Sequence, residues 1–81
     1  MRIESMLGHF LMKQARKNLA AKGVEIKGCY TVIPFHGGEN VPIKFHVDCT
    51  TEHLLTQEEV VFETELLHKE LGEIQNDIIN E

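Results

Sequence analysis

The residues best suited to chemistry in this sequence are its five histidines and two cysteines. His46, Cys49 and His53 lie within eight positions of one another, a spacing at which imidazole and thiolate groups can converge on zinc. The candidates for a fourth ligand are Cys29, His36 and His68. However, His46 and Cys49 differ by an odd number of positions, so they point to opposite faces of any strand that holds both. We therefore expect a buried thiol and surface histidines, with no bound metal or cofactor.

The sequence offers little support for a nucleophilic active site. The single serine, Ser5, lies on a predicted helix and has no base close to it in the sequence. Residues 36–38 (His-Gly-Gly) are similar to the oxyanion loops of esterases, but the serine turn that accompanies those loops is absent. Cys49 beside His46 could in principle form a thiolate pair. We predict a protein without enzymatic activity, and keep a small zinc- or cysteine-dependent activity as the second alternative.

The basic residues near the start of the chain suggest a different chemistry, the binding of phosphate. Lys13, Arg16 and Lys17 crowd one side of the predicted first helix, and Lys22 follows near its end. Cations at this spacing can follow a nucleic-acid backbone. No aromatic residue is expected among them on that side, and such a face often contributes only to solubility. A dimeric DNA-binding protein that uses this basic helix is the first alternative.

The net charge of −5 conceals a strong division along the chain. Residues 1–27 contain six basic and two acidic side chains, a sum of +4, whereas residues 28–81 contain two basic and eleven acidic ones, a sum of −9. Such a division predicts a basic helix lying near an acidic one, within a chain or between chains. It also allows a basic face for nucleic acid, or an acidic face that mimics it.

The first predicted element is a helix over residues 2–21. It ends in good helix formers, a lysine and Gly23, which suits the residue just beyond a helix. Met6 and Met12 lie at the margins of its apolar side and are expected to fill gaps in the core. The residues expected on its apolar side are Ile3, Leu7, Phe10, Leu11, Ala15 and Leu19.

The middle of the chain predicts an antiparallel hairpin. Residues 24–35 are rich in β-branched and aromatic side chains, and residues 41–49 alternate between apolar and polar ones. A loop with two glycines separates the two stretches. We expect His36 to pair with Val41, which places Cys49 opposite Gly28. Cys29 and Cys49 then point to different faces and remain free thiols. Ile33 and Phe35 point away from the core in this register.

The last predicted element is a long helix that begins after Thr56. Thr56 and Glu59 form the pattern of a capping box, in which each side chain bonds the backbone N–H of the other residue. Apolar residues then recur at spacings of three and four, interrupted by one threonine. The residues of this stripe are Val60, Thr64, Leu67, Leu71, Ile74 and Ile78.

Together these elements predict a single α+β domain over residues 1–81, with the order α-β-β-α and the hairpin packed against both helices. This order of helices and strands, with a basic first helix, resembles that of small dimeric nucleoid-associated proteins. The resemblance is to their fold alone, and no sequence motif is shared. Because a chain of this size buries a modest share of its surface, we expect a two-fold dimer. Val61, Phe62 and Leu66 are then left to contact the sheet and first helix. The residues expected between the two copies are Leu67, Leu71, Ile74 and Ile78.

The leading hypothesis for function is a cytoplasmic, non-enzymatic accessory protein that self-associates and covers the surface of a protein partner. Small inhibitors of bacterial or phage origin often have this size and charge. No apolar run approaches the ~18–20 residues of a membrane span, so no membrane association is expected.

Overall fold

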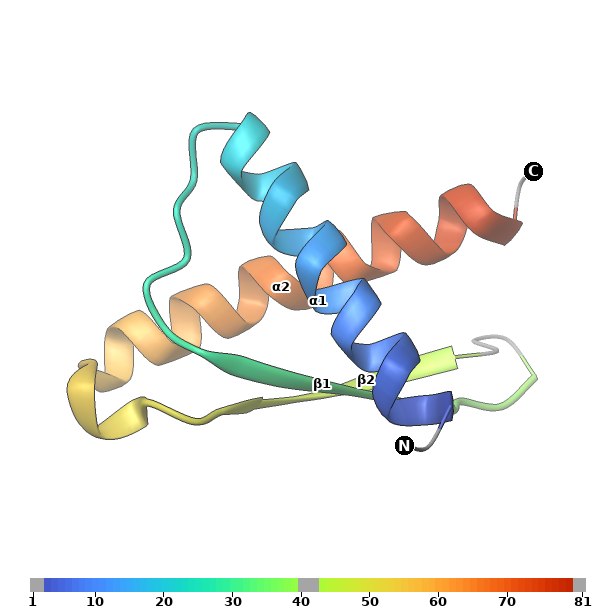
Figure 1. Cartoon of the computed structure of the whole chain (residues 1–81), viewed down its shortest axis with the longest axis horizontal. Helices are drawn as coiled ribbons and strands as arrows, with labels where there is room; N and C mark the ends of the chain where they lie inside the picture. Colours follow the sequence, from blue (N-terminus) through green and yellow to red (C-terminus); the bar gives the residue numbers. More distant parts are fainter. Residues whose placement is uncertain (1–2, 40–42, 80–81) are drawn as a thin grey trace.

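The computed structural model describes residues 3–39 and 43–79, and for residues 3–7, 78 and 79 it describes the backbone alone. It confirms the predicted α+β fold and its order of elements. Helix α1 spans Ile3–Ala21, strands β1 and β2 span Tyr30–His36 and Ile43–Cys49, and helix α2 spans Gln57–Ile79. A short 3₁₀ helix, η1 (Glu52–Leu54), lies in the connector before α2. Figure 1 shows α1 crossing α2, with the hairpin running along one side of the pair.

Helix α1 ends as its sequence predicts. Gly23 follows the helix with a φ of +84°, a conformation that suits glycine because it lacks a Cβ. The Val24 N–H donates to the Leu19 carbonyl over 2.9 Å, and the Gly23 N–H donates to the Ala20 carbonyl over 3.0 Å. These two bonds form a Schellman motif, which satisfies carbonyls that the helix itself leaves free.

The hairpin has the predicted faces but not the predicted register. His36 lies opposite Ile43, and Tyr30 lies opposite Cys49. The connection between the strands thus takes residues 37–42 instead of 37–40, although residues 40–42 lie outside the described part of the chain. Because the shift is two positions, no side chain changes face. Both cysteines are free thiols, as predicted.

The first strand is shorter than the sequence predicts. It begins at Tyr30, not at Val24, although the apolar pattern runs through the whole of residues 24–35. Ile26 is nevertheless buried, as expected. Residues 24–29 form an irregular segment, which we call the connecting segment, and side chains from both helices bind its backbone.

The core lies between the hairpin and the two helices, which cover the same face of the sheet. Leu67 and Leu71 of α2 are 0% exposed, and they meet buried residues of α1 and β1. Phe10 is an exception to the prediction for α1, because its side chain is 58% exposed. The buried core residues are Leu11, Met12, Ala15, Leu19, Ile26, Tyr30, Val32, Leu67, Leu71 and Ile74.

Helix α2 begins with the predicted capping box. The Glu59 N–H donates to Thr56 Oγ1 over 3.1 Å, and the Thr56 N–H donates to Glu59 Oε1 over 3.0 Å. The structure thereby confirms Thr56 as the N-cap. Each bond satisfies a backbone donor that has no partner inside the helix.

Removing the cap hydroxyl should weaken the fold measurably. We expect Thr56→Ala to lower the free energy of unfolding by ~1 kcal/mol, because the Glu59 N–H loses its acceptor. Chemical denaturation at pH 7 measures this difference. Thr56→Ser, which keeps the hydroxyl, is the matched control and should retain most of the stability. An alanine variant as stable as the serine variant would contradict the role of the cap.

Glu59 should make a contribution to stability that depends on pH. Its hydrogen bonds with Thr56, and then the nearby Lys27 ammonium, lower the pKa of Glu59 from an ordinary value of 4.5. A carboxyl whose pKa is lowered by folding stabilises the folded state above its unfolded pKa and loses that contribution as pH falls. We therefore expect Glu59→Gln to be less stable than the wild type at pH 7, and the difference to disappear as pH falls below 4.5. Urea melts at several pH values measure it, and a constant difference would contradict the prediction.

Candidate functional site

The structure does not bring His46, Cys49 and His53 together as a ligand set. His46 lies on the outer face of β2, where its Nε2 is 2.9 Å from an oxygen of Asp48. Cys49 lies on the opposite face of the same strand, and His53 belongs to η1. Within residues 3–39 and 43–79, no three histidine, cysteine, aspartate or glutamate side chains are placed to hold a metal ion.

The four basic residues predicted as a binding face have different roles in the structure. Lys13 and Lys17 are exposed on α1. Lys22 instead pairs with two carboxylates of α2, Glu70 at 2.8 Å and Glu73 at 3.2 Å. The hydrogen bond with Glu70, followed by that with Glu73, raises the pKa of Lys22 above its ordinary value of 10.5.

Arg16, the fourth of these basic residues, is committed to the connecting segment. Its guanidinium donates to the Ile26 carbonyl over 2.9 Å and to the Gly28 carbonyl over 3.0 Å. A continuous array of four cations on α1 is therefore not present.

Glu63 binds the same segment from the side of α2. Its carboxylate accepts hydrogen bonds from the N–H groups of Lys27 (2.7 Å) and Gly28 (3.1 Å), and from the Tyr30 hydroxyl (2.8 Å). Glu63 is 5% exposed. Arg16 thus donates to two carbonyls of the connecting segment, and Glu63 accepts from two of its N–H groups, so these backbone groups have partners outside the sheet.

The environment of Tyr30 indicates that this cluster is structural. Burial, followed by the hydrogen bond to Glu63 and the charge of that carboxylate, raises the pKa of Tyr30 far above its ordinary value of 10.0. The hydroxyl therefore remains a hydrogen-bond donor at neutral pH. Glu63 already accepts three hydrogen bonds at a site that is 5% exposed, so the geometry of this cluster accounts for how the connecting segment is held.

Glu63 and Glu70 of α2 are acidic, and residues of this type usually lie on the solvated face of a helix. Both are buried. They lie four positions before Leu67 and Ile74, respectively, and therefore on the same side of the helix as the core residues. Spacing alone would have located them, but the residue type suggested exposure because unpaired carboxylates are seldom buried. Here each has a partner on another element.

Both edges of the hairpin are covered by helices at one point. The Thr50 N–H donates to the Cys29 carbonyl, and in an antiparallel pair of strands every second residue is hydrogen-bonded to its partner. Val32 and Phe45 belong to the other set, so their carbonyls point away from the partner strand. On the β1 side, α1 approaches so closely that a Cβ at Gly8 would overlap the Val32 carbonyl oxygen. On the β2 side, His68 Nε2 is 3.3 Å from the Phe45 carbonyl. This close packing limits access to the edges by another strand.

The outer sheet face, by contrast, has no helix over it. This surface consists of Thr31, Ile33 and Phe35 of β1 with Lys44, His46 and Asp48 of β2. Ile33 and Phe35 are both nearly half exposed, and the polar residues flank them. The sequence correctly predicted that Ile33 and Phe35 would point away from the core.

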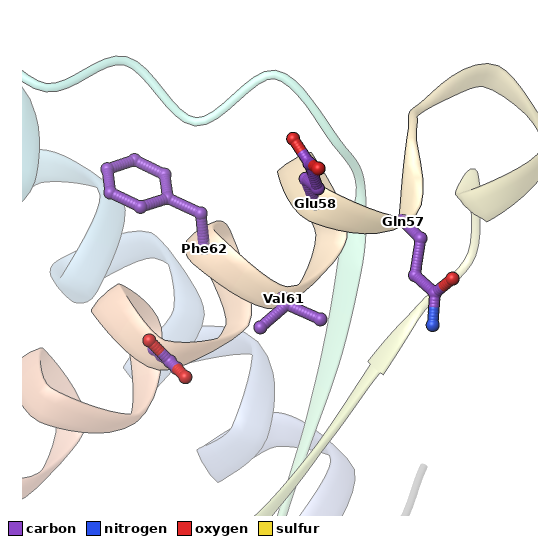
Figure 2. A pocket seen from close by; sticks show the side chains of 5 residues that line it. Gln57, Glu58, Val61 and Phe62 are labelled. Atoms are coloured by element: carbon purple, nitrogen blue, oxygen red, sulfur yellow. The ribbon is translucent and has the colours of Figure 1, made fainter.

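A second apolar surface lies on the first turns of α2, as Figure 2 shows. It is a hollow of about 400 Å³, which we call the α2 hollow, and its lining residues are Gln57, Glu58, Val61, Phe62 and Glu65. Phe62 is 60% exposed and Val61 is also exposed, although both were predicted to contact the sheet and first helix. The core side of α2 is instead occupied by the Leu67 stripe.

A third surface lies on α1, where Phe10 stands three positions before Lys13 and seven before Lys17. All three are exposed, and their helical spacing places them on one side. We call this the α1 ridge. The α1 ridge was not predicted from the sequence, because Phe10 was expected in the core and the two lysines were therefore expected to have no aromatic neighbour.

Three of the four residues predicted between two copies lie in the interior of a single chain. Leu67 and Leu71 are fully buried there, and Ile74 is also buried. The side chain of Ile78 lies outside the described part of the structure. A contact between copies is therefore more readily made by the exposed surfaces than by this stripe.

Comparison of the chain with protein-family models, with curated proteins and with solved structures finds no match in any of the three. In the described ranges, neither helix combines the length and apolar character needed to cross a membrane. The three exposed surfaces are therefore the basis on which a function is proposed.

Proposed function

We propose that the protein is a non-enzymatic accessory protein that acts by self-association and by binding a protein partner. The observation that carries this proposal is the exposure of large apolar side chains beside a core that one chain completes by itself; the described residues include seven of them. Single exposed apolar residues are common, but grouped ones mark sites of interaction. Two of the seven lie on the outer sheet face, two in the α2 hollow and one on the α1 ridge, whereas Ile43 and Leu54 lie elsewhere.

The outer sheet face has the composition of a protein-binding surface. Ile33 and Phe35 form an apolar centre, and the polar side chains of Lys44, His46 and Asp48 border it on the β2 side. Protein interfaces commonly combine an apolar, aromatic centre with a polar rim. A rigid hairpin held by two helices also presents such side chains at little conformational cost.

A capture experiment with matched variants tests the partner. Tagged wild-type protein, Ile33→Asp and Thr31→Asp are used as baits in extracts of the native cell, with circular dichroism to verify folding. The two variants add the same charge to the same face, but only the first removes an apolar side chain. Proteins captured by the wild type and Thr31→Asp and lost with Ile33→Asp support the proposal. Identical capture by all three baits would contradict it.

The nucleic-acid alternative is less well supported, because two of its four basic residues bind other parts of the same chain. A salt titration of DNA binding distinguishes the two functions. Contacts with several phosphates produce a steep fall of affinity with salt. We expect no such binding at physiological salt, and a steep slope that Lys13→Gln and Lys17→Gln reduce would favour the DNA-binding alternative.

A further inference from the structure

We propose that two copies of this chain associate by placing the α1 ridge of one copy in the α2 hollow of the other. The inference rests on the self-association in the proposed function and assigns its contact surfaces. It does not involve the outer sheet face, which remains available to a different protein.

The two surfaces are complementary in apolar character and in charge. The α1 ridge projects one aromatic side chain, Phe10, beside two lysines. The α2 hollow has an apolar centre, Val61 and Phe62, between two glutamates. A phenyl ring seated between these apolar residues would lose water-exposed surface on both sides and could form an aromatic pair with Phe62.

The spacings on the two surfaces also agree. Lys13 follows Phe10 by three positions, and Glu58 precedes Val61 by three positions. Three residues of helix span about 4.5 Å, so in two antiparallel helices Lys13 can lie beside Glu58 when Phe10 lies on Val61. The division of charge along the chain favours the contact, because the ridge belongs to the basic part and the hollow to the acidic part.

The order of charges determines the relative direction of the two helices. On α1, both lysines follow Phe10. On α2, the apolar centre is followed by Glu65 and then Lys69, but it is preceded by Glu58. A parallel ridge would bring Lys17 towards Lys69, whereas an antiparallel ridge would bring Lys13 towards Glu58 and keep both lysines away from Lys69. The antiparallel arrangement is therefore the one we assign.

Each copy carries one ridge and one hollow, so the contact can be made twice in a pair. If a two-fold axis relates the copies, both contacts form together and the assembly closes as a dimer. A single contact per pair would leave a ridge and a hollow free and would extend into an open chain. Sedimentation equilibrium distinguishes a dimer from a series of larger species.

Charge exchange provides a direct test of the pairing. One variant carries Lys13→Glu with Lys17→Glu, and the other carries Glu58→Lys with Glu65→Lys. In either variant alone the ridge and hollow carry like charges, and we expect roughly 100-fold weaker self-association than in the wild type. In an equimolar mixture every ridge meets a hollow of opposite charge, so association should return. All four positions are exposed, and circular dichroism verifies that both variants fold.

Controls separate this contact from charge effects in general. Lys44→Glu makes the same kind of change on the outer sheet face and should associate as the wild type does. If the wild type associates and both exchange variants associate equally well, self-association stands but these surfaces do not mediate it. A wild-type mass of 9.3 kDa at every concentration would overturn both the contact and the self-association. The capture experiment on Ile33 would then still decide whether a different protein binds.

Discussion

Glu63→Ala is expected to lower the free energy of unfolding by about 3–5 kcal/mol. The substitution removes the acceptor for three donors, the N–H groups of Lys27 and Gly28 and the hydroxyl of Tyr30. Hydrogen bonds to a charged group each contribute about 1.5–3 kcal/mol, and donors left buried without a partner add a desolvation cost. The backbone of the connecting segment would lose its hydrogen bonds to α2, while the bonds from Arg16 of α1 would remain.

Denaturant melts measure this loss, and two variants define its origin. Glu65→Ala removes an exposed glutamate from the same helix and should change stability by less than about 0.5 kcal/mol. Tyr30→Phe removes one of the three donors and should cost about 1.5–3 kcal/mol, the contribution of one hydrogen bond to a charged group. Hydrogen exchange at the Lys27 and Gly28 amides should accelerate in Glu63→Ala. If Glu63→Ala and Glu65→Ala were equally stable, the buried carboxylate would have no structural role.

Leu71→Ala is expected to cost about 2–5 kcal/mol. Leu71 is 0% exposed and belongs to the cluster formed by both helices and the hairpin. Truncation removes buried apolar surface and leaves a cavity, because packed neighbours relax only in part. The same chain covers this residue, so the loss does not require a second copy.

Thermal and denaturant melts at several protein concentrations test this point. Asn76→Ala is the control, since it shortens an exposed residue of the same helix outside the proposed contact surfaces and should change stability by less than about 0.5 kcal/mol. The difference between Leu71→Ala and the wild type should persist at concentrations where the protein is monomeric. A difference that vanished at low concentration would instead place Leu71 between two copies.

Local chemistry explains the features that were predicted correctly. The Thr56–Glu59 capping box and the Gly23 terminator depend on residues within a few positions, so their spacing is sufficient to locate both helix ends. The faces of the hairpin follow from the two-residue period of a strand, which explains why Tyr30 and Val32 are buried although the register is shifted by two.

The features that were predicted wrongly depend on partners far away in the sequence. The apolar pattern of residues 24–29 favoured a strand there, but the Arg16 guanidinium and the Glu63 carboxylate form hydrogen bonds with this backbone instead. These partners lie on two different helices. Their meeting is a consequence of how α1 and α2 cross, which no local spacing specifies.

The three exposed surfaces show the same division. Composition and periodicity determined that α1 is basic, that α2 is acidic and that each has an apolar stripe. Composition and periodicity did not determine how many residues on either side of each stripe are buried when the helices pack. Phe10 and Phe62 lie outside the buried part. Helix α1 contacts the sheet so closely at Gly8 that the core accommodates Leu11, Ala15 and Leu19 but leaves Phe10 in solvent. The interaction surfaces thus arise from packing geometry, because a side chain is exposed or buried according to the neighbours that the fold brings to it.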